Sequence, residues 1–280
     1  MSSRLALPAL VLALALTGCD ATGTDSALLQ EDASDAAVSI ADALALNSGG
    51  ALDDAASVAA LVTADASKSG PMSDRPGCSG DRTFDEATST WTTTVACERG
   101  REDGRRYHAF SRTTTHRFLD EAGAPLPGRE GATAVEFAIV EGSGEHRTPR
   151  GSAIVSDLGA DLDVLRLDDG QVSASGTYSR EGSRTALGRR GGSRAVDYAL
   201  SLELDGVTGP AGRRDRWRGA TAGSVSGLYT ATVTVTNADG EVSTRDVERE
   251  FTVSFPVDGR ARIALGGRSF TADAATGEVL

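Results

Sequence analysis

The feature that most constrains this fold is the alternation of apolar and polar residues, with a period of two, over the C-terminal two thirds of the chain. Successive side chains of a β-strand point to opposite faces, so this alternation predicts strands with one apolar face. Strands of a parallel sheet are buried on both faces and are apolar at nearly every position, so the pattern favours an antiparallel sheet. The clearest runs are Val135/Phe137/Ile139, Val196/Tyr198/Leu200/Leu202/Leu204, Val225/Tyr229/Val233/Val235 and Val247/Phe251/Val253/Phe255.

Pairs of turn-forming residues fall between these runs, where hairpins need them. They are Asp103-Gly104, Asp169-Gly170, Asp239-Gly240, Asp258-Gly259 and Gly266-Gly267. The spacing predicts roughly ten to twelve strands between Cys78 and Leu280. We therefore expect a mainly β fold, an antiparallel meander that forms either a sandwich or a curved barrel-like sheet.

Two of these turns predict the register of their strands. A two-residue loop at Gly266-Gly267 places Ile263 opposite Phe270 on one face. A two-residue loop at Asp239-Gly240 would instead place Val233 opposite Asp246 and so pair apolar with polar residues throughout. We therefore expect an odd-length loop or a bulge there, with Gly240 in the left-handed conformation.

The region before the strands has helical periodicity and a marked acidity. Two apolar patterns at helical spacing flank a stop at Asn47-Ser48-Gly49-Gly50, and a linker rich in Gly and Pro follows at Ser67 to Gly77. The faces are mostly alanine, so each short helix is marginal unless it packs on something larger. The helical positions are Ala37/Ile40/Ala41/Leu44 and Leu52/Ala55/Ala59/Val62.

Residues 20–67 contain nine acidic residues and no Lys or Arg. We interpret this segment as a solvated tether. The expected organisation is an acidic tether with two short helices and a linker over residues 19–77, followed by an antiparallel β domain over residues 78–280. The acids are Asp20, Asp25, Glu31, Asp32, Asp35, Asp42, Asp53, Asp54 and Asp65.

The first 18 residues have the build of a secretory signal peptide: Arg4, an apolar stretch from Leu5 to Leu16, and small residues before a cysteine. The motif Leu16-Thr17-Gly18-Cys19 resembles the lipobox of bacterial lipoproteins, a likeness limited to residues 1–20. It implies removal of residues 1–18, lipidation of Cys19 and a lipid anchor in a membrane of the cell envelope, inner or outer not determined. The alternative is an ordinary secreted protein in which Cys19 is incidental.

In an exported chain, the two remaining cysteines predict a disulfide. A turn between Ala87 and Thr88 places Phe84 opposite Trp91 and, on the same face, Cys78 opposite Cys97. The 18 intervening residues exclude a CxxC redox site, and two cysteines alone are too few ligands for zinc.

No motif for catalysis, cofactor or metal stands out. The sequence lacks HExxH, GxSxG and GxGxxG motifs, and its one lysine, in the linker, excludes a P-loop. We interpret His108, His116 and His146 as surface residues, since strand spacing puts His108 and His116 roughly 26 Å apart. Asn237 to Glu241 is interpreted as a hairpin turn rather than a calcium loop. We expect no cofactor, no metal and no catalytic residue.

The charge argues against nucleic acid as a partner, because a net charge of −12 repels phosphate backbones. The densest basic clusters are the runs at 189–194 and 213–218. Their functional interpretation is contact with anionic lipid or polysaccharide, but we prefer solvated loops and strand edges blunted by charge.

Three functions remain open. The first is a lipid-anchored envelope protein with a non-enzymatic binding or structural β domain, its partner a lipid, a polysaccharide or an envelope protein. The second is a periplasmic carrier of lipids or lipoproteins, whose half-barrels have a similar order of elements. The third is an envelope hydrolase that uses paired carboxylates, drawn from acids such as Asp157, Asp161, Asp163, Asp168 and Asp169.

Overall fold

The computed structural model describes residues 22–45, 49–62, 77–167, 170–188, 191–210, 222–256 and 259–280. These residues form two helices and one 12-stranded antiparallel sheet. The helices are α1 (Thr22–Leu44) and α2 (Ala51–Val62). The strands are β1 (Cys78–Asp85), β2 (Thr90–Gly100), β3 (Tyr107–Leu119), β4 (Pro125–Leu126), β5 (Ala134–Thr148), β6 (Gly151–Arg166), β7 (Gln171–Leu187), β8 (Ser193–Pro210), β9 (Ala222–Thr236), β10 (Val242–Ser254), β11 (Arg260–Leu265) and β12 (Arg268–Asp273).

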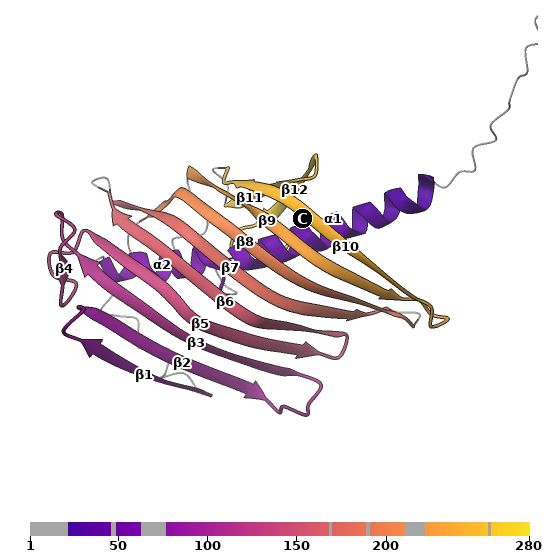
Figure 1. The fold of residues 1–280 in the computed structure, drawn as a ribbon, viewed down its shortest axis with the longest axis horizontal. Helices are drawn as coiled ribbons and strands as arrows, with labels where there is room; N and C mark the ends of the chain where they lie inside the picture. Colours follow the sequence, from indigo (N-terminus) through magenta and orange to yellow (C-terminus); the bar gives the residue numbers. More distant parts are fainter. Residues whose placement is uncertain are drawn as a thin grey trace, which may run out of the picture.

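The sheet is a meander, because strands that follow one another along the chain are neighbours in the sheet. Its order is β1-β2-β3-β5-β6-β7-β8-β9-β10-β11-β12, and β4 pairs with β3 (Figure 1). The predicted mainly β antiparallel meander is confirmed. Of the two forms expected, the structure has the single curved sheet rather than the sandwich.

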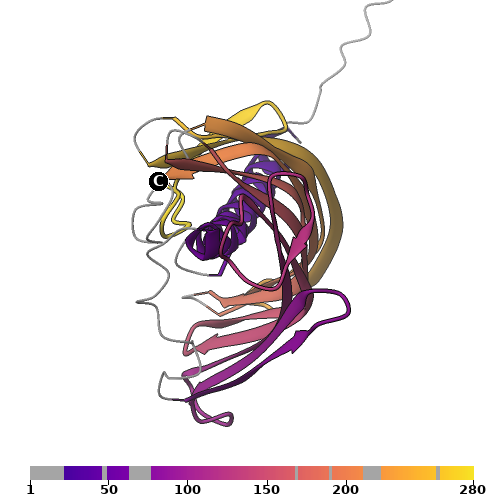
Figure 2. The same cartoon turned by 90° about the vertical axis from the view of Figure 1, so that its left-hand side faces the viewer.

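The helices lie inside the curve of this sheet. Seen end-on, the strands wrap around α1 and α2 and leave one side open (Figure 2). The principal contacts of α2 are with β5, β6 and β7, and those of α1 with β9, β11 and β12. We call the helix-facing side of the sheet the trough and the opposite side the convex face.

The two predicted helices are confirmed, but the solvated tether is wrong for their described residues. The alanines of both helices belong to the same hydrophobic core as the strands. Three of the acids are also buried, namely Asp32, Asp53 and Asp54. An alanine face buries little area by itself, so these helices are stabilised by the large curved surface on which they pack.

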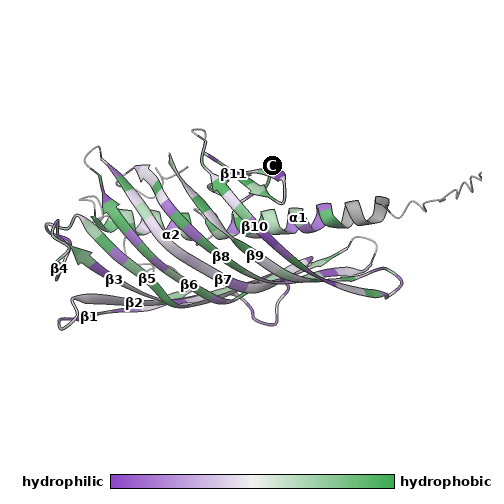
Figure 3. Cartoon of the chain, turned by 45° about the horizontal axis from the view of Figure 1, so that its top comes forward, coloured by the Kyte–Doolittle hydropathy of each residue, from purple (hydrophilic) through white to green (hydrophobic). Residues whose placement is uncertain are grey.

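The alternation read from the sequence matches the burial of the strands. In β8, Val196, Tyr198, Leu200, Leu202 and Leu204 are all buried, whereas most residues between them are more exposed. Figure 3 shows hydrophobic and hydrophilic residues alternating along the strands. One apolar face therefore packs on the helices and the other lies in solvent.

The predicted register at both turns is confirmed. Ile263 lies opposite Phe270 in the β11–β12 hairpin. The β9–β10 loop has an odd length, because Thr236 pairs with Val242 and five residues separate them, and Gly240 has a φ of 86°. In this loop the side-chain oxygen of Asn237 accepts hydrogen bonds from the backbone N–H of Asp239 and Glu241, at 3.0 and 2.9 Å. The loop is thus a hairpin turn, as interpreted from the sequence.

Irregularities in pairing accompany the curvature of the central strands. The register shifts between Val155 and Asp157 in β6, and between Ala174 and Gly176 in β7. Gly176 has a φ of 134°, and a Cβ at that position would lie 2.1 Å from the backbone oxygen of Asp161. Bulges of this kind bend and twist strands, so they help the sheet to wrap around the helices.

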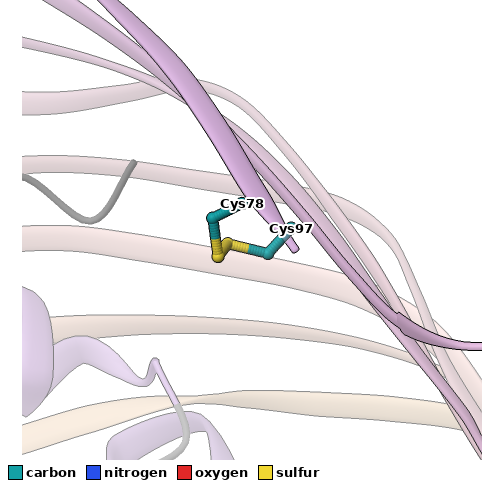
Figure 4. The surroundings of a disulfide bond; sticks show 2 residues. All are labelled: Cys78 and Cys97. Atoms are coloured by element: carbon teal, nitrogen blue, oxygen red, sulfur yellow. A yellow bond between two sulfur atoms is a disulfide. The ribbon is translucent and has the colours of Figure 1, made fainter. Parts of the chain in front are cut away.

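The predicted disulfide joins the first two strands. Cys78 pairs with Cys97 and Phe84 with Trp91, in the expected register. The disulfide bond joins two neighbouring strands, and the Cα atoms of the two cysteines are 4.0 Å apart (Figure 4). This crosslink fixes the edge hairpin of the sheet.

Candidate functional site

The trough is the candidate site, because the two faces of the sheet differ in charge. The register places basic side chains among the apolar residues of the trough. The acids of the strands point the other way. The trough bases include Arg99, His108, Arg112, His146, Arg180, Arg184, Arg194, Arg245 and Arg249, and the convex acids include Glu98, Glu136, Glu145, Asp157, Asp161, Asp163, Glu181, Asp197, Glu203, Asp246, Glu248 and Glu250.

Among the acids of α1 that contact arginines of the trough, Asp32 is the most buried. Its side chain is 3% exposed and accepts hydrogen bonds from two arginines, Arg194 on β8 at 2.8 Å and Arg245 on β10 at 2.6 and 2.8 Å. Burial opposes ionisation of this carboxyl, but the hydrogen bonds from Arg245 and Arg194 outweigh it and hold its pKa below the usual value. Asp35 also pairs with Arg194.

Two further ion pairs hold the helices along the trough. Arg180 of β7 contacts Asp42 of α1 at 2.9 Å, and Arg112 of β3 pairs with Asp54 at the start of α2. Arg112 also donates to the backbone oxygen of Gly49 at 3.1 Å, a carbonyl to which the hydroxyl of Tyr178 donates at 3.4 Å. The negative charge of the helical segment is thus neutralised by the trough, which explains why so acidic a segment packs inside the fold.

The sequence contains a signal that these arginines face the core, although it was not among the sequence predictions. Arg245 has the same parity as the buried Val247, Phe251 and Val253 of its strand, so it must point toward the core. A cation at a core-facing position requires an anionic partner. The acids before residue 63 are the natural source, but the sequence does not say which acid meets which arginine.

An aromatic cluster lies at the other side of the trough, on β1, β2 and β3. The rings of Phe84 and Trp91 are 4.7 Å apart, and His116 lies edge-on to Phe118 at 5.3 Å. The guanidinium of Arg82 lies over the indole of Trp91, 4.2 Å from the ring centroid, and its Nη2 is 3.2 Å from Nε2 of His116. Phe84, Trp91, His116, Phe118 and Arg82 are called the aromatic cluster below.

The interpretation of all three histidines as surface residues is wrong for His116. Its residue is 6% exposed, within the aromatic cluster. Desolvation, with a smaller contribution from the charge of Arg82, lowers its pKa to about 4, so the imidazole is neutral at pH 7. The spacing of residues along β3 alone does not indicate that His116 is buried.

The other two histidines are exposed, as expected, but they lie together. His108 of β3 and His146 of β5 are direct cross-strand partners, and their ring centroids are 5.9 Å apart. Arg99 of β2 pairs with His108 from the other side. Desolvation, with smaller contributions from His146 and Arg99, lowers the pKa of His108. The pairing depends on the order of the strands, which the sequence analysis had not assigned.

The described acids considered for a hydrolase, Asp157, Asp161 and Asp163, lie on the convex face. Asp157, Asp161 and Asp163 all belong to β6, and Asp161 and Asp163 are two residues apart on one side of one strand, about 7 Å along it. Desolvation, with the charges of Glu136 and Asp161, raises the pKa of Asp163. These acids do not face each other across a cleft.

Shallow depressions also cross the convex face. The largest described has a volume of about 750 Å³ and is lined by small and hydroxylated residues such as Ser179, Ser201 and Ser226, together with Glu203 and Glu250. A depression with this polar and open lining differs from the enclosed apolar pockets that most small ligands occupy.

Several sequence predictions lie outside the described residues. They are the signal peptide, the lipobox with Cys19, Asp20, Asn47 and Ser48, Asp65, residues 67–76 of the linker, Asp168 and Asp169, the arginines at 189–190, the run at 213–218, and Asp258. In the part of the chain that the structure describes, no helix is long and apolar enough to span a bilayer. Nor does that part contain three or more His, Cys, Asp or Glu side chains grouped to hold a metal ion.

Comparisons with known proteins found no matching family model, no matching curated protein and no matching solved structure. The function is therefore argued from the residues and their geometry.

Proposed function

We propose that this chain is a lipid-anchored protein of the bacterial cell envelope whose curved sheet is a non-enzymatic binding or scaffolding module. The lipobox resemblance at residues 16–19 supports the anchor. The observation that carries the binding role is the trough, a basic and apolar surface. Several of its arginines bind acids of the chain's own helices, whereas Arg99, His108 and His146 form no ion pair among the described residues.

Replacement of Cys19 tests the anchor. Cys19→Ser removes the thiol that would carry the lipid, so we expect the protein to move from the membrane fraction to the soluble fraction of the envelope. Asp20→Asn is the matched control, since it leaves the cysteine in place and should stay with membranes. A Cys19→Ser protein that remains in the membrane fraction would contradict the proposal.

A second candidate is a carrier of lipids or lipoproteins. The observation that favours it is the open curved sheet with helices on its concave side (Figure 2). Mass spectrometry of molecules that copurify with the mature chain separates the two candidates. A stoichiometric lipid supports the carrier, whereas an envelope protein or polysaccharide supports the scaffold.

A further inference from the structure

One cross-strand row of the trough runs from a helix-bound arginine to a group of basic residues that no helix acid contacts. Successive partners along the row are Arg245, Val233, Val196, Arg184, Ala153, His146, His108 and Arg99, from β10 to β2. At the β10 end, Arg245 binds the carboxylate of Asp32. At the β2 end, Arg99, His108 and His146 are adjacent. Within the described residues, neither Arg99 nor Arg184 forms an ion pair.

Among the described residues, the charged side chains that flank this group on the same face of the sheet are basic. Arg99 on β2 and His146 on β5 are the two cross-strand neighbours of His108. Beyond His146, the row continues through Ala153 to Arg184 on β7. The nearest acids on the same strands, Glu98 and Glu145, have the opposite parity and point to the convex face. The lowered pKa of His108 agrees with this placement.

The next row of the trough carries no charge. It consists of Cys97, Phe110, Gly144, Val155 and Gly182, in register across five strands. The rings of His108 and Phe110 are 6.1 Å apart, so the apolar row begins directly beside the basic group. Gly144 presents no side chain, which leaves the floor of the trough low between Phe110 and Val155.

We infer that this part of the trough binds an anionic amphiphile, with its acidic head group on Arg99, His108 and His146 and its apolar tail along Phe110 and Val155. Charge complementarity carries the inference, because Arg245 at the other end of the same row and Arg194 in the neighbouring row already hold the carboxylate of Asp32. The inference specifies a lipid-like ligand, so it rests on the second candidate function, the carrier. A bound anion favours the protonated imidazole, so binding should raise the lowered pKa of His108.

The test is a titration of the mature chain with decyl phosphate below its critical micelle concentration, followed by the histidine Cε1–H signals in NMR spectra at several pH values. We expect saturable binding that raises the pKa of His108 and shifts the signals of both His108 and His146. Arg99→Ala should weaken binding about tenfold, because it removes roughly one charge-assisted hydrogen bond. Arg101→Ala is the matched control, since Arg101 is exposed in the neighbouring loop and pairs with Asp103; it should bind as the parent does.

Two further probes test each half of the ligand. Inorganic phosphate should bind far more weakly than decyl phosphate, and equal binding would overturn the role of the apolar row. Decyl maltoside has the same tail and no charge, and equal binding of it would overturn the role of the basic group. An unresponsive Arg99→Ala variant, or no binding of decyl phosphate, overturns the inference. The Cys19→Ser fractionation would stand unchanged, so failure of this ligand is distinguishable from failure of the anchor.

Discussion

The helix-covered strands and the edge hairpin obtain their stability in different ways. In β8, alternate residues from Val196 to Leu204 are buried beneath the helices. In β1, no residue is fully buried, and in β2 only Cys97 is. The edge hairpin is held instead by the disulfide and by the aromatic cluster. Local crosslinks and ring contacts therefore stabilise strands that the helices do not cover.

This difference also divides the chemistry of the trough. Where the helices lie, arginines are neutralised by Asp32, Asp35, Asp42 and Asp54. Where they do not, Arg99, His108 and His146 are exposed. The comparison predicts that disruption of helix acids destabilises the whole molecule, whereas changes in the edge hairpin remain local.

The largest effect is expected at Asp32. Asp32→Ala leaves Arg194 and Arg245 without their shared buried carboxylate, so we expect a loss of about 3 kcal/mol in the free energy of unfolding. Urea denaturation measures it. Glu31→Ala is the control. The Glu31 side chain contacts Arg194 but is 64% exposed, so this substitution should lower the free energy of unfolding by less than about 1 kcal/mol. Equal effects of the two variants would show that the buried ion pairs of Asp32 do not stabilise the region that the helices cover.

Reduction of the disulfide should affect the edge only. The bridge closes a loop of 19 residues in sequence separation. The loop-entropy account gives about 3 kcal/mol for such a loop, less any strain. Hydrogen exchange should accelerate in β1 and β2 on reduction and stay unchanged in β7 to β10. The double variant Cys78→Ala/Cys97→Ala should not respond to reductant. Equal acceleration in the covered strands would show that the hairpin is not a local unit.

Acidification should weaken the aromatic cluster. The pKa of His116 is about 4 in the folded chain and about 6.5 when unfolded. The unfolded state therefore binds more protons between these values, and stability falls as the pH drops through this window, by about 2 kcal/mol from pH 7 to 4.5. His116→Leu should lose this part of the pH dependence while the contribution of the helix acids remains. An NMR titration that places the pKa of His116 near 6.5 would contradict its burial.

The smallest effect is expected at Trp91. Its indole N–H donates to the backbone oxygen of Pro127 at 3.2 Å, a bond that Trp91→Phe removes while an aromatic ring remains beside Phe84. We expect a loss of about 1 kcal/mol in urea denaturation. Thr90→Ser, on the same strand, is the conservative control. A Trp91→Phe protein as stable as the parent would show that this hydrogen bond does not matter to the edge.

Much of the sheet was predictable because its determinants are local. The alternation of apolar and polar residues predicted the strands, and the turns predicted the register of the hairpins at Cys78/Cys97 and Ile263/Phe270. The position of the helices was not, because Asp32 and Arg245 are 213 residues apart and their pairing depends on how the sheet curves. The burial of His116 was missed for the same reason, since Arg82 and Trp91 reach it from neighbouring strands.

Hydrogen–deuterium exchange of the mature chain tests most directly whether the helices occupy the trough. We predict that amides of residues 33–44 and 51–62 exchange as slowly as those of β8, because both belong to one core. Exchange of these helical amides within seconds, beside protected strands, would mean that the acidic segment is a solvated tether, and the account of the trough would be wrong.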